Sequence, residues 1–198
     1  MPNASSFVKP QSITYSLDGE SRRWDMVESH SSVAILLYHR QLDSLILVRQ
    51  FRPAVYVSES RAAAPGAPRL PLTAGLTFEL CAGIVDKDKT LKEIAHEEIL
   101  EETGFSVPLD SIVELTSFIS AIGISGARQT MFMAEVDDSM KTHDGGGLDH
   151  DGEAIEVVAL PMANLEPFLL DGTICKSSGL MFASMHFKHV LGKQIITG

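Results

Sequence analysis

The chain has 198 residues, of which 44% are hydrophobic and 21% are charged, a composition typical of one globular domain and not of a disordered chain. Its 26 acidic residues outnumber its 16 Lys and Arg residues, giving a formal charge of −10, so we expect no nucleic-acid or membrane partner. Two cysteines, no apolar run near the ~20 residues of a membrane span, and no secretory signal favour a cytoplasmic protein without disulfides.

The N-terminal residues 1–30 are predicted to form a β arm. Strand-like runs at 13–16 and 22–27 flank Asp18-Gly19, a strong signal for a tight turn. An isolated hairpin is only marginally stable in water, so this arm should pack on the same chain or on a second copy.

The remaining residues, 31–198, are predicted to form one domain. The stretch 57–77 is rich in Ala, Pro and Ser and is expected to be a mobile surface insertion, and the acidic, Gly-rich stretch 139–152 a flexible loop. The mixed order of elements predicts an α+β fold or an α/β/α sandwich. The expected strands are 33–38, 45–48, 78–83, 112–119, 130–136 and 155–160, and the expected helices are 91–102, 163–170 and 179–190.

The helix predicted at 91–102 carries carboxylates on its inward face. At ~100° per residue, Glu98 and Glu102 lie on the same stripe as Ile94 and Ala95, which should face the protein. No Lys or Arg within the helix lies three or four residues from either glutamate. Half-buried carboxylates are unfavourable unless a cation binds, and clustered oxygen ligands suit Mg²⁺ or Mn²⁺. The pattern therefore indicates a divalent-cation site.

Residues 83–105 resemble the Nudix box, Gly-x5-Glu-x7-Arg-Glu-U-x-Glu-Glu-x-Gly-U, in which U is a bulky aliphatic or similar residue. Gly83 and the segment 98–105 keep its spacing in full. Two positions depart from it, because Lys89 replaces the first Glu and Glu97 replaces the Arg. The family's Arg usually helps to hold the glutamates, so another group must orient them here, and Lys89 and a second metal ion are the candidates.

The resemblance covers roughly residues 13–190 and is closest to the branch of the family that hydrolyses nucleoside diphosphate sugars. It implies a Nudix fold with a mixed β-sheet, in which the box forms a loop–helix–loop of an α/β/α sandwich. It also implies Mg²⁺ as the cofactor, with Mn²⁺ as a substitute, and a homodimer whose N-terminal β arm crosses to the partner. The segments that carry it outside the box are 49–53, 79–83, 117–120 and 152–157.

The same resemblance implies a set of metal ligands. Glu98 and Glu102 match the metal-binding glutamates, and Ala82 matches the position that offers a main-chain carbonyl to the metal. Glu101 matches a further catalytic ligand that often acts through water. Glu153 matches the family's late acidic residue, which is a metal ligand or the catalytic base.

The resemblance also implies the base and the substrate contacts. Glu153 is the expected base, and Asp151 is the alternative. Arg52 and Glu79 match positions that contact substrate in this branch. Arg128 is a candidate contact for a phosphate or the nucleobase of the substrate, since a guanidinium suits a bidentate anion. A surface ion pair is its alternative role.

The segment after the box bears on the substrate. ADP-ribose enzymes of this branch typically carry Ser-Pro-Gly there with an acidic residue beyond it, whereas Ile122 and Ala127 occupy those positions here. The segments 50–55 and 126–132 most resemble UDP-sugar diphosphatases. The expected reaction is Mg²⁺-dependent hydrolysis of UDP-glucose to UMP and glucose 1-phosphate. ADP-ribose hydrolysis and a catalytically silent nucleotide-binding module are the alternatives.

Overall fold

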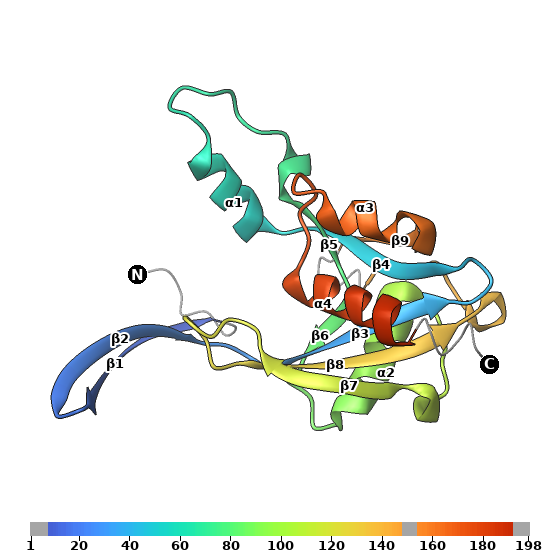
Figure 1. Ribbon diagram of the computed structural model, residues 1–198, viewed down its shortest axis with the longest axis horizontal. Coiled ribbons are helices and arrows are strands. Elements are labelled where there is room, and N and C mark those ends of the chain that lie inside the picture. The colour runs from blue at the N-terminus through green and yellow to red at the C-terminus, as the bar shows by residue number, and fades with distance from the viewer. Residues whose placement is uncertain (1–7, 148–153, 192–198) are drawn as a thin grey trace.

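The computed structural model describes residues 8–147 and 154–191, in which a mixed seven-stranded sheet carries helices on both faces and a separate two-stranded hairpin projects from one end (Figure 1). The strands are β1 (Lys9–Leu17), β2 (Glu20–Glu28), β3 (Ser32–His39), β4 (Ser44–Phe51), β5 (Leu76–Glu79), β6 (Cys81–Ile84), β7 (Val113–Ile119), β8 (Arg128–Val136) and β9 (Ile155–Pro161). The α-helices are α1 (Pro53–Ala62), α2 (Leu91–Thr103), α3 (Leu165–Leu170) and α4 (Ser178–His186), which continues as a π-helical turn at Phe187–Leu191. No helix in these ranges is long and apolar enough to cross a membrane.

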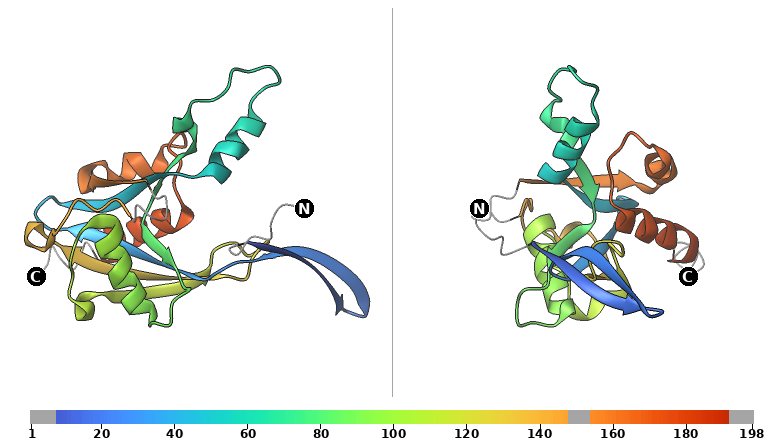
Figure 2. Two further views of the ribbon diagram at one scale, coloured as in Figure 1. Left: turned by 180° about the vertical axis from the view of Figure 1, so that it is seen from behind. Right: turned by 90° about the vertical axis from the view of Figure 1, so that its left-hand side faces the viewer.

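Strand β3 is buried on both of its sides. The odd-numbered residues from Val33 to Leu37 pack with the buried face of α2, and the even-numbered residues from Ala34 to Tyr38 pack with α3 and α4. A continuous apolar run is what a strand covered on both faces requires. The views from opposite sides accordingly show α4 over one face and α2 over the other (Figures 1 and 2). The predicted mixed sheet between helices is confirmed.

The sheet forks where β3 and β4 diverge. These two strands pair only near their connecting turn, at 37–39 with 44–46. Beyond that point β6 pairs with the free edge of β3, and β5 pairs with the corresponding edge of β4. Leu80 is the crossing residue between β5 and β6. The single strand expected at 78–83 is therefore two strands, because the chain changes its pairing partner at Leu80.

The insertion after β4 is partly helical. Helix α1 has Pro53 in its first turn, where the missing amide hydrogen is not needed. Tyr56 anchors the helix, since its hydroxyl donates to the Leu70 carbonyl at 2.9 Å and its ring lies 5.7 Å from that of Phe51. The expected surface insertion therefore includes part of a helix, which buries none of its residues and projects from the body (Figure 1), and its mobility stays a prediction.

The glycine run 145–147 is fixed to the end of α2. Two of its amides donate to the carbonyls of Glu101 and Glu102, at 3.2 and 2.9 Å. The φ angles of the three glycines are +78°, +116° and +79°, a region that favours glycine. The last carbonyls of a helix need such partners. The expected flexible loop is therefore an ordered cap up to residue 147, and 148–153 lie outside the described residues.

One face of the hairpin of β1 and β2 carries a stripe of apolar side chains. Ile13 pairs with Trp24 across the strands, and alternate residues of a strand share a face. Ile13, Tyr15, Leu17 and Trp24 are 41%, 38%, 47% and 51% exposed. At the base of the hairpin, the Trp24 indole donates to the Gly123 carbonyl at 3.1 Å. Within the described residues, the hairpin thus presents an apolar stripe to solvent.

Candidate functional site

Glu102, in the last turn of α2, is a buried carboxylate, only 4% exposed. Its Oε2 accepts a hydrogen bond from the Ala82 amide of β6 at 3.0 Å. The thiol of Cys81 lies beside it, and burial together with the negative charge and hydrogen bond of Glu102 raises the pKa of that thiol well above its usual value. Helix α2 therefore presents a carboxylate to β6, as the helical pattern of the sequence predicts.

Glu98 lies one turn earlier and packs against the glycine that opens the box. A Cβ added at Gly83 would lie 2.1 Å from both Cδ and Oε1 of Glu98. Only a glycine leaves room for this carboxylate beside β6. Glu98 is half-buried, whereas its neighbours Ile94 and Ile99 are fully buried. The two carboxylates therefore line the edge of α2 that faces β6.

These groups fit a hard divalent cation. Within residues 8–147 and 154–191, no three Asp, Glu, His or Cys side chains converge closely enough to hold a metal ion by themselves. A cation between Glu98 and Glu102 would therefore use main-chain carbonyls and water as well, which suits Mg²⁺ because it keeps several waters when bound. Glu101 is half-buried on the same turn. Asp151 and Glu153 lie outside the described residues.

The two residues that depart from the Nudix box contact each other. Lys89 forms an ion pair with Glu97, and the Lys87 ammonium lies 3.4 Å from the same carboxylate. The hydrogen bond from Lys89, supported by that from Lys87, outweighs partial burial and lowers the pKa of Glu97. The charges at the two motif positions are thus exchanged and remain complementary. Sequence reasoning named Lys89 as a candidate to orient the family's glutamates but did not pair it with Glu97, although their opposite signs were a readable signal.

The predicted substrate residues Arg52 and Glu79 are brought together as a bidentate pair. The Arg52 Nε and Nη2 donate to the two carboxylate oxygens of Glu79 at 2.8 and 2.7 Å, and the Thr77 hydroxyl adds a bond of 2.5 Å. Burial acts to raise the pKa of Glu79, but the hydrogen bonds from Arg52 and Thr77 outweigh it and lower that pKa. Arg52 is the more exposed partner, with 46% of its side chain accessible.

Arg128 lies apart from this pair, at the first position of β8. Its Nη1 is 3.5 Å from the Ser117 hydroxyl of β7, and its side chain is exposed. It is not among the residues that line the cavity described next, whereas its neighbour Gln129 is.

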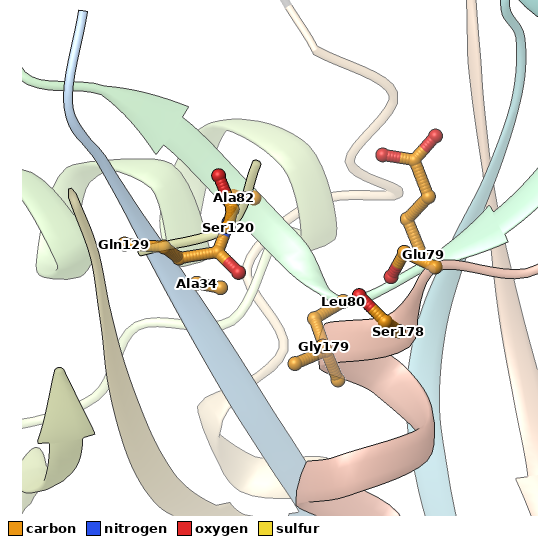
Figure 3. Close-up of a pocket in the computed structure, with 9 residues that line it drawn as sticks. Ala34, Glu79, Leu80, Ala82, Ser120, Gln129, Ser178 and Gly179 are labelled. Atoms are coloured by element: carbon orange, nitrogen blue, oxygen red, sulfur yellow. The ribbon is translucent and has the colours of Figure 1, made fainter. Parts of the chain in front are cut away.

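A cavity of about 150 Å³ opens at the fork of the sheet (Figure 3). Glu79 connects it to the Arg52 pair, and Ala82 connects it to Glu102. Sequence reasoning missed most of its wall, because small neutral residues from distant segments carry no motif. The residues that line it are Ala34, Glu79, Leu80, Ala82, Ser120, Gln129, Ser177, Ser178 and Gly179.

Comparison with known proteins gives clear relatives, although no protein-family model matches the chain. Uridine diphosphate glucose pyrophosphatase NUDT14 of Bos taurus is 38% identical over 198 residues, covering 93% of this chain and 89% of the relative. The protein of the same name from Mus musculus is 36% identical, covering 92% and 89%. A GDP-mannose pyrophosphatase of Klebsiella pneumoniae is 32% identical over 170 residues, covering 83% and 77%. The chain accordingly belongs to the Nudix hydrolase family of nucleotide-sugar pyrophosphatases.

Proposed function

We propose that the protein hydrolyses the pyrophosphate bond of a nucleoside diphosphate sugar, with UDP-glucose as the preferred substrate and UMP and glucose 1-phosphate as products. The observation that carries the proposal is the pair of inward carboxylates, Glu98 and Glu102, beside a cavity at the sheet fork. The names of the relatives at 38% and 36% identity support the uridine nucleotide and the glucose.

The proposed cofactor is Mg²⁺, with Mn²⁺ as a substitute. Glu98, Glu102 and the Ala82 carbonyl are the proposed ligands, and Glu101 is proposed to act through water. The bound cation would offset phosphate charge, polarise a phosphoryl oxygen and lower the pKa of a water molecule. The burial of Glu102 supports this assignment, since a buried carboxylate gains most from a nearby cation.

The chain's own residues would position the diphosphate and move one proton. Water adds to one phosphorus, the bond from that phosphorus to the bridging oxygen breaks, and the bridging oxygen leaves on the other phosphate. Glu153 is proposed to take the proton of the water, with Asp151 as the alternative. Arg52, held in its orientation by Glu79, is proposed to bind a phosphate. Arg128 is proposed as a second anion contact.

We further propose a homodimer in which residues 1–30 act as the dimerisation arm of a single domain, 31–198. The exposed apolar stripe of the hairpin supports this, because contiguous apolar patches commonly mark protein interfaces. The opposite face of the hairpin is polar, with Ser12, Thr14 and Ser16 on β1. One face is therefore suited to a partner and the other to solvent.

A cytoplasmic location is proposed from the cysteines. Cys81 is buried and Cys175 is exposed, and both are free thiols. Free thiols persist in a reducing compartment.

The function is tested with a panel of UDP-glucose, GDP-mannose and ADP-ribose, assayed with and without Mg²⁺. We expect UDP-glucose to have the highest kcat/KM and turnover to require the cation. Mass spectrometry should identify UMP and glucose 1-phosphate. A preference for ADP-ribose would contradict the substrate assignment, and binding of UDP-glucose without any product would indicate a silent module.

The metal site is tested by Glu102→Gln. The amide keeps an acceptor oxygen for the Ala82 amide but loses the charge, so folding should persist while turnover falls by orders of magnitude. Mn²⁺ binding, followed by electron paramagnetic resonance, should weaken in parallel. Glu59→Gln, on the exposed helix α1, is the control and should change neither quantity. Unaltered Mn²⁺ affinity in Glu102→Gln would remove this residue from the metal site.

The exchanged ion pair is tested by a double-mutant cycle. Lys89→Glu or Glu97→Arg alone places like charges together and should lower kcat/KM by about tenfold, the size typical of residues that orient metal ligands. The double variant restores opposite charges and should recover most of the loss. Lys92→Glu, on the same helix, is the control. Additive losses in the double variant would show that the pair does not orient the carboxylates.

The arm is tested by light scattering coupled to size-exclusion chromatography. Ile13→Glu places a charge in the apolar stripe and should dissociate the dimer. Thr14→Glu, on the polar face of the same strand, should leave it intact. A monomeric wild type, or equal masses for both variants, would argue against the dimerisation arm.

A further inference from the structure

We propose that the cavity at the sheet fork binds the sugar of the substrate and that Gly179, in the first turn of α4, limits the size of the sugar that fits. This assignment rests on the proposed nucleotide-sugar hydrolysis and adds to it a position for one part of the substrate. It follows from the chemistry of the cavity wall and from what lies at its two ends.

The wall of the cavity does not suit a phosphate. Among the described residues that line it, there is no Lys, Arg or His. Its one charged residue is Glu79, whose carboxylate points away from the other lining side chains (Figure 3) and is bound by Arg52. A phosphate within the cavity would lack a cationic partner and would lie close to negative charge. The phosphates are better placed outside, near Arg52 and the carboxylates of α2.

The wall does not suit a nucleobase either. The described lining residues include no aromatic side chain on which a planar base could stack. Phe118 and Phe182 pack against each other nearby, with ring centroids 6.4 Å apart, and they are not part of the wall.

The wall does suit a group rich in hydroxyls. Ser120, Ser178 and Gln129 contribute neutral donors and acceptors, and Ala34, Leu80 and Ala82 form an apolar side. A hydroxyl both donates and accepts, and an amide carries both kinds of group, so each can pair with a sugar hydroxyl of either sense. Gln129 is also held in place, since its amide nitrogen donates to the Ser32 hydroxyl at 3.1 Å.

The position of the cavity agrees with its chemistry. Ala82 lines the cavity and also donates its amide to Glu102, so the cavity begins where the proposed metal site ends. A sugar linked to a diphosphate would extend from the carboxylates into this space. The Ser177 hydroxyl oxygen accepts the Leu180 amide at 3.2 Å as the cap of α4, and its O–H group can still donate.

Gly179 determines how much room the cavity has for a sugar. It is buried, and a Cβ added to it would lie 3.0 Å from Oε1 of Gln129 and 3.7 Å from Cε of Met131. Both contacts are with the ends of flexible side chains, so a larger residue can be accommodated by the fold. A larger side chain at position 179 would fill part of the cavity and displace the Gln129 side chain.

The experiment measures two ratios of kcat/KM in Gly179→Val. The sugar ratio compares UDP-glucose with UDP-xylose, which lacks the hydroxymethyl group. The base ratio compares UDP-glucose with ADP-glucose. We expect the sugar ratio to fall by about tenfold, as for one added or missing carbon in a fitted pocket, while the base ratio stays constant. Gly172→Val is the control, since nothing lies within 4 Å of a Cβ at Gly172.

The outcomes separate this inference from the proposed function. A changed base ratio with a constant sugar ratio would place the base in the cavity, and two constant ratios would place the cavity outside the substrate site. Either result overturns the inference. Gln129→Leu, which keeps the size of the side chain but removes its amide, should shift the sugar ratio in the same direction and serves if Gly179→Val does not fold. Failure of wild type to hydrolyse any of these substrates would instead contradict the proposed function.

Discussion

The site depends on one buried interaction, the hydrogen bond from the Ala82 amide to the Glu102 carboxylate. It joins the end of α2 to the strand that crosses the fork of the sheet. A carboxylate at 4% exposure is unfavourable without compensation, and the Ala82 amide offsets part of its lost hydration. A bound cation would stabilise this buried carboxylate, so the fold holds Glu102 in a position where binding a cation is favourable.

The fork makes this arrangement possible. In a regular sheet, β3 and β4 would pair along their full length and leave no space between them. Because β5 and β6 enter at the divergence and change partners at Leu80, the sheet opens there. Side chains from β5, β6, β8 and α4 meet around this opening. The proposed metal site and the proposed sugar site are therefore neighbours along one short segment, 79–84.

Two further contacts fix the carboxylate helix, one near its middle and one at its C-terminal end. Near the middle of α2, Glu97 binds Lys87 and Lys89 from the loop that precedes the helix, with the charges exchanged relative to the family's motif. At the C-terminal end, amides of the glycine run 145–147 donate to the last carbonyls of α2. The positive φ angles of this run would strain any residue with a side chain. A helix that is bound to two different segments keeps its carboxylates in a fixed orientation, which matters because metal ligands act only in the correct geometry.

The sequence by itself determined the elements with regular patterns and the chemistry that local spacing encodes. The apolar run of β3, the helix α2 and the inward position of Glu98 and Glu102 all follow from periodicity, which depends only on near neighbours in the chain. The Nudix resemblance likewise depends on a contiguous motif, and the relatives confirm the family.

Only the tertiary structure decided which distant residues meet. It showed that Lys89 compensates Glu97, that the stretch beginning at Gly145 caps α2 and does not hang as a free loop, and that Gln129 and Gly179 share a cavity. The last two pairings have no local signal, because each joins segments far apart in the chain, whereas Lys89 and Glu97 lie eight residues apart and their opposite signs were a readable signal. Neutral residues such as Gly179 acquire a role only through the space that their neighbours leave.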